Sequence, residues 1–128
     1  MLDHEDGAIG RLSMSRSGKV RSRPALAIVE RLYADIDGYR LSHLGRRRRA
    51  TRERALTYGE VLLAPFLAIL REANPRRSEV FYDLGSGTGK AVLMAATAFN
   101  FARVVGIEVL PELHRVAERV LALLPYAL

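Results

Sequence analysis

The 128-residue sequence contains no cysteine, which excludes disulfide frameworks, thiolate zinc sites and a cysteine nucleophile. It lacks any uninterrupted run of about 18 apolar residues, the length that suggests a membrane-spanning helix. Three of its first six residues are acidic, whereas a secretory signal begins basic and continues apolar. The three histidines are scattered and have no metal-ligand spacing. These absences predict an intracellular protein with no membrane contact and no metal site.

Acidic residues are too few in the N-terminal part of the chain to balance its arginines. Residues 1–54 hold 13 Lys or Arg against 7 Asp or Glu, whereas residues 55–128 hold 7 of each. Such asymmetry favours contact with nucleic acid, nucleosomes or another acidic partner, although an arginine-rich coding bias or a solvated linker helix would explain it as well. The residues expected to make a nucleic-acid contact are Arg46, Arg47, Arg48, Arg49, Arg52 and Arg54.

The N-terminal part divides into two segments of different pattern. Residues 1–24 are rich in Ser, Gly and Arg without apolar periodicity, which predicts a disordered basic tail. Residues 25–57 are predicted to form a helical basic arm. It begins with a short helix over residues 25–33, which Asp37-Gly38 closes.

The rest of the chain alternates between helix and strand patterns. Residues 61–70 are apolar on all sides and predict a buried helix, and residues 79–84 predict a core strand. A helix over residues 90–99, a second strand over 103–108 and a last helix starting at Pro111 follow. Strands joined by such a helix must lie parallel. The pattern therefore predicts the first two parallel strands, with their helices, of a doubly wound, Rossmann-like α/β fold.

The turn after the first strand, residues 83–89, reads Asp-Leu-Gly-Ser-Gly-Thr-Gly and lies where such sheets bind ligands. A nucleotide-triphosphate loop is excluded, because Leu84 stands where it needs glycine and Ala91 where it needs a hydroxyl. A dinucleotide fingerprint needs G-x-G-x-x-G, and the carboxylate of Asp83 would repel its pyrophosphate. The alternative is that these glycines merely turn the chain.

S-adenosylmethionine (SAM) reverses that electrostatic argument, because it carries a sulfonium and an ammonium and no phosphate. Asp83 then attracts the ligand instead of repelling it. Glu108, at the end of the second strand, is placed to accept hydrogen bonds from ribose hydroxyls, as it would be in a dinucleotide site. The predicted cofactor is therefore SAM.

Tyr58-Gly59-Glu60, the run from Val80 to Lys90 and the segment from Val105 to Glu108 together resemble the non-SET histone lysine methyltransferases of the disruptor-of-telomeric-silencing type. The resemblance covers roughly residues 55–120. It implies that residues 58–128 are a partial SAM-binding domain of the class I methyltransferase fold. A loop at residues 58–60 would close over the methionine end of SAM, Asp83 would engage that end, the glycines would pass beneath the cofactor and Glu108 would bind the ribose. The implied cofactor-binding residues are Tyr58, Gly59, Glu60, Asp83, Gly85, Ser86, Gly87, Thr88, Gly89, Lys90 and Glu108.

Two features depart from the family pattern. Lys90 stands where the best-known members have glutamine, which adds a positive charge near a cationic ligand. The chain ends at Leu128, before a third and fourth strand, so no catalytic residue is assigned. We expect an N-methyltransferase of histone lysine that acts on nucleosomes in the nucleus. The alternatives are methylation of another protein, RNA or a small molecule, and a truncated SAM-binding fragment without catalysis.

Overall fold

The computed structural model describes residues 9–15, 22–50 and 52–127. Within them the chain forms three strands, five α-helices and a short 3-10 helix. In chain order these are β1 (Gly10–Ser15), α1 (Ser22–Leu32), α2 (Gly38–Arg48), η1 (Arg54–Leu56), α3 (Leu63–Ala73), β2 (Val80–Leu84), α4 (Lys90–Ala98), β3 (Arg103–Glu108) and α5 (Pro111–Ala127).

The strands form one mixed sheet in the order β1-β3-β2. β2 and β3 are parallel, with Val80 opposite Arg103, which confirms the predicted parallel pair. α4 connects them, and α5 begins at Pro111 as predicted. Because both strands end at the same edge of the sheet, the turn after β2 and the end of β3 lie side by side.

β1 corrects the prediction of a disordered tail over residues 1–24. Residues 10–15 pair antiparallel with β3, with Gly10 opposite Glu108. Leu12 of this strand is buried, at 3% exposed, and belongs to the core. The strand owes its place to backbone hydrogen bonds with the free edge of β3. Residues 1–8 and 16–21 of the predicted tail lie outside the described part of the chain.

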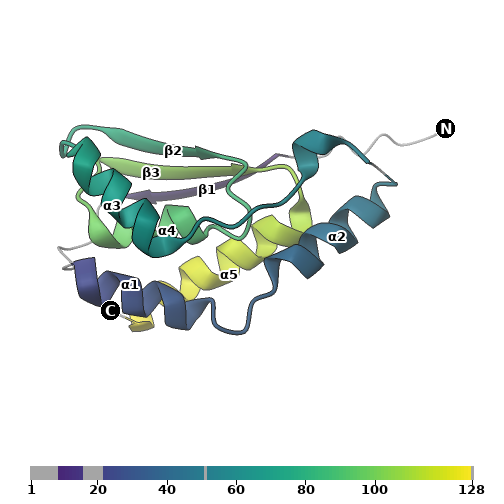
Figure 1. The fold of residues 1–128 in the computed structure, drawn as a ribbon, viewed down its shortest axis with the longest axis horizontal. Coiled ribbons are helices and arrows are strands. Elements are labelled where there is room, and N and C mark those ends of the chain that lie inside the picture. Colours follow the sequence, from purple (N-terminus) through teal and green to yellow (C-terminus); the bar gives the residue numbers. More distant parts are fainter. Residues whose placement is uncertain (1–8, 16–21, 51, 128) are drawn as a thin grey trace.

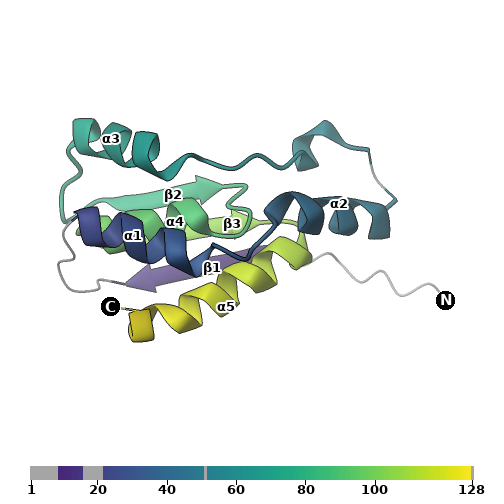
Figure 2. The ribbon, with the colours of Figure 1, turned by 60° about the horizontal axis from the view of Figure 1, so that its bottom comes forward.

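All the helices lie on one side of the sheet (Figure 1). α4 packs directly beneath β2 and β3, α1 packs against α4 from outside, and α2 packs against α5. The view in Figure 2 shows α1 in front of α4 and α5 running alongside β1. The core lies between the helices and the inner face of the sheet. It contains Leu12, Ala25, Val29, Leu67, Val92, Leu93, Met94, Ala95, Val104, Val116, Ala117 and Val120.

Two predictions of full burial are wrong. β2 is an edge strand whose outer face is open, and Val80, Tyr82 and Leu84 are 43%, 56% and 78% exposed. Alternate residues of a strand face opposite sides of the sheet, and here helices cover only one side. α3 likewise buries one stripe at i, i+4, i+7 spacing (Leu63, Leu67 and Leu70) and leaves its opposite side in solvent.

The described part of residues 25–57 contains most of α1 together with α2 and η1, and α1 packs into the same core as the rest of the chain. Ala25 and Val29 of α1 are fully buried. Asp37 does not close a helix; its side chain accepts a hydrogen bond from the Arg40 amide at 2.9 Å and caps the start of α2. Within the described residues, no helix combines the length and apolar character that crossing a membrane requires.

Candidate cofactor site

The glycine turn between β2 and α4 is tied to the end of β3 by its own backbone. The amides of Gly85 and Ser86 both donate to the Ile107 carbonyl, at 2.8 and 3.0 Å. The Gly89 amide donates to the Ser86 carbonyl at 2.8 Å and closes the turn, after which α4 begins. The turn is therefore held at the carboxyl edge of the parallel strands, where ligands of such sheets bind.

Gly87 shows why this turn needs glycine. Its φ is +55°, a region that residues with a Cβ adopt with strain. A Cβ at this position would lie 2.6 Å from Cε2 of Tyr58. Only glycine permits this backbone and this approach of the tyrosine ring. Gly85 and Gly89 also have positive φ.

Glu108 is buried behind the turn, with 6% of its surface exposed. One carboxylate oxygen accepts from the Gly87 amide and the other from the Leu110 amide, both at 2.8 Å. The side chain thus joins the glycine turn to the chain that leaves β3. Its oxygens retain further lone pairs, since a carboxylate offers about four acceptor sites.

The loop at residues 58–60 reaches the glycine turn through side chains. The Tyr58 hydroxyl donates to one oxygen of Glu60 at 2.9 Å and lies 3.3 Å from the Thr88 hydroxyl. The other oxygen of Glu60 forms an ion pair with the Lys90 ammonium at 3.0 Å. Both charged side chains are about four-fifths buried. The structure therefore brings together residues that are 30 positions apart in the sequence.

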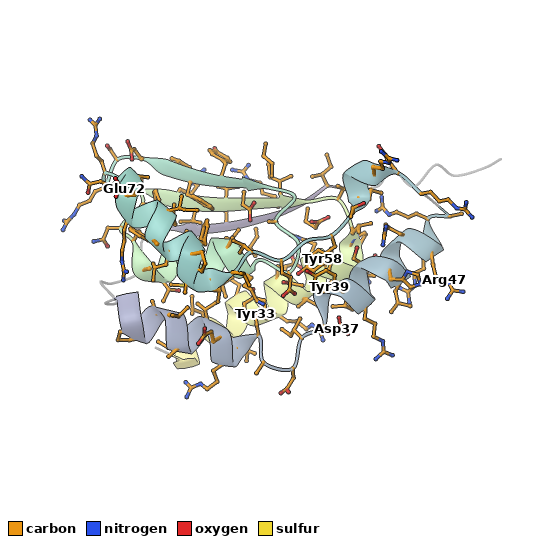
Figure 3. All side chains as sticks on the ribbon, in the orientation of Figure 1. Tyr33, Asp37, Tyr39, Arg47, Tyr58 and Glu72 are labelled. Atoms are coloured by element: carbon orange, nitrogen blue, oxygen red, sulfur yellow. The ribbon has the colours of Figure 1, made fainter. Side chains whose placement is uncertain are left out.

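Two further tyrosines precede this loop in the chain; Tyr33 contacts the glycine turn and Tyr39 contacts the loop. The Tyr33 hydroxyl donates to the Thr88 carbonyl at 2.7 Å, and its ring lies 5.5 Å from the Lys90 ammonium. The Tyr39 ring packs edge-on against Tyr58, with 5.1 Å between ring centroids. Figure 3 shows the three tyrosines gathered beside the turn. Sequence analysis missed Tyr33 and Tyr39, because helical periodicity gives no sign of which ring meets a distant loop.

The hydroxyls of Tyr33 and Tyr58 act as donors, whereas the hydroxyl of Tyr39 accepts from the Glu60 amide at 3.4 Å. Burial raises the pKa of Tyr33 above its ordinary value, and the neighbouring Tyr58 and Glu60 add to the effect. Burial also raises the pKa of Tyr58, with Glu60 raising it further. Both phenols therefore stay protonated at neutral pH, as their hydrogen bonds to acceptor oxygens require.

A cavity of about 180 Å³ lies between this loop, the glycine turn and β2. Small-molecule sites commonly measure roughly 300–1,000 Å³, so the cavity is sized for one end of a cofactor. Eight of the eleven predicted site residues line it; Gly87, Gly89 and Glu108 do not. The lining consists of Tyr58, Gly59, Glu60, Val61, Phe66, Phe81, Asp83, Gly85, Ser86, Thr88, Lys90 and Ala91.

Asp83 is the charged group of the cavity that lacks a partner. Its carboxylate makes no hydrogen bond or ion pair with any described residue, whereas Glu60 and Lys90 neutralise each other. Burial raises the pKa of Asp83, and the nearby charge of Glu108 raises it further. The Ser86 hydroxyl oxygen is also buried without a partner among the described residues. The unpaired carboxylate suits a cationic group of a ligand. The ion pair beside it suits the ammonium and carboxylate of a zwitterionic group.

Among the described residues, the titratable side chains that line the cavity are Tyr58, Glu60, Asp83 and Lys90. No group of three or more metal-ligating side chains occurs in the described part of the chain. The arrangement can bind and orient a cation and shield it from water.

The chain matches a known protein family. The family described as histone methylation protein DOT1 matches residues 48–126, well over half of the chain. The matched region includes the loop at residues 58–60, the glycine turn and β3. No curated protein and no solved structure matches the chain.

Proposed function

The chain belongs to the DOT1 family of histone lysine methyltransferases, and on this premise we propose that its cavity holds the methionine end of SAM. In this proposal β2, the glycine turn, α4 and β3 form the first unit of a Rossmann-like class I methyltransferase fold. SAM supplies the electrophilic methyl group when bound. The residues of this chain bind the cofactor, orient it and exclude water.

The observation that carries the proposal is the unpaired carboxylate of Asp83 at the cavity. A half-buried carboxylate with a raised pKa gains most from a nearby cation, because the cation offsets the cost of its burial. SAM brings a sulfonium and an ammonium. A phosphate-bearing cofactor would place negative charge against Asp83 instead.

The ion pair of Glu60 and Lys90 matches the zwitterionic end of the same ligand. Glu60 would accept from the ammonium of the methionine moiety, and Lys90 would donate to its carboxylate. The extra positive charge of Lys90 is therefore compatible with SAM, since Glu60 already neutralises it at 3.0 Å. Hydrogen bonds from two backbone amides hold the Glu108 carboxylate behind the turn. We propose that its free lone pairs accept hydrogen bonds from the ribose hydroxyls.

The proposed substrate is the side-chain amine of a histone lysine. Methyl transfer to an amine requires a deprotonated nucleophile held in line with the methyl group. The residues described above account for holding the methyl donor. A histone substrate places the protein in the nucleus, beside DNA, and we propose that the arginine-rich stretch Arg46, Arg47, Arg48, Arg49, Arg52 and Arg54 faces nucleic acid there.

Calorimetric titration of the purified chain with SAM tests the cofactor assignment. We expect the wild type to give heat on titration. Asp83→Ala should bind SAM at least tenfold more weakly, because it removes the carboxylate that attracts the cation, and each factor of ten corresponds to about 1.4 kcal/mol. Glu72→Ala is the matched control, since this carboxylate is exposed on α3, away from the tyrosine cluster (Figure 3). Equal heats from the wild type and Asp83→Ala would refute the assignment.

A further inference from the structure

The six arginines at and beyond the end of α2 do not share one environment. Nη1 of Arg48 forms an ion pair with Glu112 at 3.1 Å, and Nη2 of Arg49 donates to the Val109 carbonyl at 2.9 Å. Glu112 lies in the first turn of α5, and Val109 lies two residues before its first residue, Pro111. These two arginines therefore fasten the end of α2 to the start of α5.

Three other arginines are left without partners. Arg46, Arg47 and Arg52 make no ion pair and no side-chain hydrogen bond with any residue in the described ranges. They line one open pocket of about 600 Å³ together with His43 and Ala50. Among the described residues, no acidic side chain lines this pocket. Its positive charge is therefore uncompensated within the described part of the protein.

The backbone builds this pocket at an energetic cost. Ala50 has a φ of +49°, which a residue with a Cβ adopts at roughly 1–2 kcal/mol of strain. The Ala50 amide donates to the Arg47 carbonyl at 3.1 Å, so the chain turns sharply after α2. Arg52, beyond this turn, then lines the same pocket as Arg46 and Arg47. In addition, Nε of Arg46 is buried without a hydrogen-bond partner in the described chain.

We infer that the pocket of His43, Arg46, Arg47 and Arg52 binds successive backbone phosphates of double-stranded DNA. Guanidinium groups bind phosphate oxygens through paired N–H donors, and free arginines are available for this without breaking an existing pair. The pocket is also far larger than one phosphate group. Figure 3 places Arg47 at the end of α2 farthest from the tyrosine cluster, so DNA there would leave the cofactor cavity open.

The choice of DNA over an acidic peptide rests on the proposed action on histones. The inference itself sharpens that function, because it divides five of the six arginines of this stretch into two groups with different tasks. Arg46, Arg47 and Arg52 bind phosphate, whereas Arg48 and Arg49 hold the fold together. The two groups lie in one short segment and consist of the same residue type, three arginines in one and two in the other, which makes each a control for the other.

Fluorescence anisotropy of a labelled random-sequence duplex, titrated with the full chain between 50 and 200 mM salt, tests this division. The logarithm of the binding constant falls with the logarithm of salt by about 0.9 for each phosphate contact. We expect the triple variant Arg46→Gln, Arg47→Gln, Arg52→Gln to lose about 2.7 from this slope, which is three contacts at about 0.9 each. Its melting temperature should stay that of the wild type. The single variant Arg47→Gln should lose about 0.9.

The double variant Arg48→Gln, Arg49→Gln is the matched control. It should melt at a lower temperature and keep most of the wild-type slope. A triple variant that is folded with an unchanged slope would overturn the inference, as would a control that loses as much slope as the triple variant. If polyglutamate displaced the duplex at an equal concentration of negative charge, the choice of phosphate over carboxylate would be overturned.

The proposals of SAM binding and of DNA binding can be refuted independently of each other. DNA binding is measured without SAM, and SAM titration is measured without DNA. A wild-type chain that gives heat with SAM and no anisotropy change with DNA would overturn the phosphate pocket alone. The reverse result would overturn the cofactor assignment and leave the phosphate pocket standing.

Discussion

Replacing Glu108 by glutamine should destabilise the fold by about 2–3 kcal/mol. Both oxygens of this buried carboxylate accept backbone hydrogen bonds, from Gly87 and from Leu110, at 2.8 Å. Glutamine keeps one acceptor oxygen and turns an NH₂ group toward the second amide, so one bond is lost and one buried donor is left unpaired. A hydrogen bond to a charged group contributes about 1.5–3 kcal/mol, which sets the expected magnitude.

Urea unfolding at neutral pH, with the free energy extrapolated to water, measures this loss. The midpoint should fall while the slope with urea stays that of the wild type, because the surface exposed on unfolding is unchanged. Glu118→Gln on α5 is the matched control: Glu118 is 58% exposed and lies 3.5 Å from His114. It should change the free energy of unfolding by less than about 0.5 kcal/mol.

The reasoning is refuted if Glu108→Gln unfolds within about 0.5 kcal/mol of the wild type. Glu108 would then be dispensable for joining the turn to β3, and the two short distances would carry little energy. A loss equal to that of Glu108→Ala would show instead that the glutamine oxygen recovers neither bond.

Three further changes test the turn and its supports. Asp83→Asn should raise the free energy of unfolding at pH 7 by roughly 0.5–2 kcal/mol while weakening SAM binding. Because the folded pKa of Asp83 is raised, wild-type stability should fall as pH rises from the ordinary aspartate pKa through that raised pKa, and urea unfolding at several pH values should show this dependence diminished in the asparagine variant. Gly87→Ala should cost about 1–3 kcal/mol through positive φ and contact with Tyr58, whereas Gly59→Ala, with open space around its Cβ, should be nearly neutral by the same assay. Tyr33→Phe keeps the ring and loses the buried hydroxyl bond, so its thermal unfolding should show a loss of about 0.5–1.5 kcal/mol, and an unchanged melting temperature would contradict the role given to that bond.

The elements around the turn were predictable because their signals are local. A β-branched and aromatic run that ends at glycine predicts a strand, and β2 forms at Val80–Leu84. Proline at a first helical position predicts the start of α5, and α5 begins at Pro111. The acidic residue before the turn and the acidic residue that ends β3 were found by their position relative to these elements. Each of these inferences needs only a short window of sequence.

β1 was missed because its pairing is not local. Gly10 lies opposite Glu108, and a strand held by an edge so distant in the chain needs few apolar residues of its own. The exposure of β2 was missed for a related reason. An apolar run shows that a strand can be buried, but whether helices cover one or both of its faces depends on the whole fold.

The sequence predicted which residues would lie at the site, but it did not predict the hydrogen bonds between them. Glu108 was assigned to the ribose from its strand position, yet its oxygens accept from two backbone amides that no motif reveals. Tyr33 and Tyr39 were absent from the predicted set, because they meet the turn from helical segments that carry no cofactor motif. The division of the arginines likewise depends on which of them reach α5.

Lys90 shows how the pairing of charges alters the electrostatic argument for SAM. Counted alone, it places a positive charge beside a cationic ligand and weighs against that ligand. In the fold, Glu60 lies 3.0 Å from its ammonium, and the pair contributes almost no net charge to the cavity. The remaining charge is that of Asp83, which has no partner in the described chain. The preference for a cation therefore depends on Asp83 together with the pairing of Glu60 and Lys90, and a variant that breaks this pair should change cofactor affinity even though Asp83 is untouched.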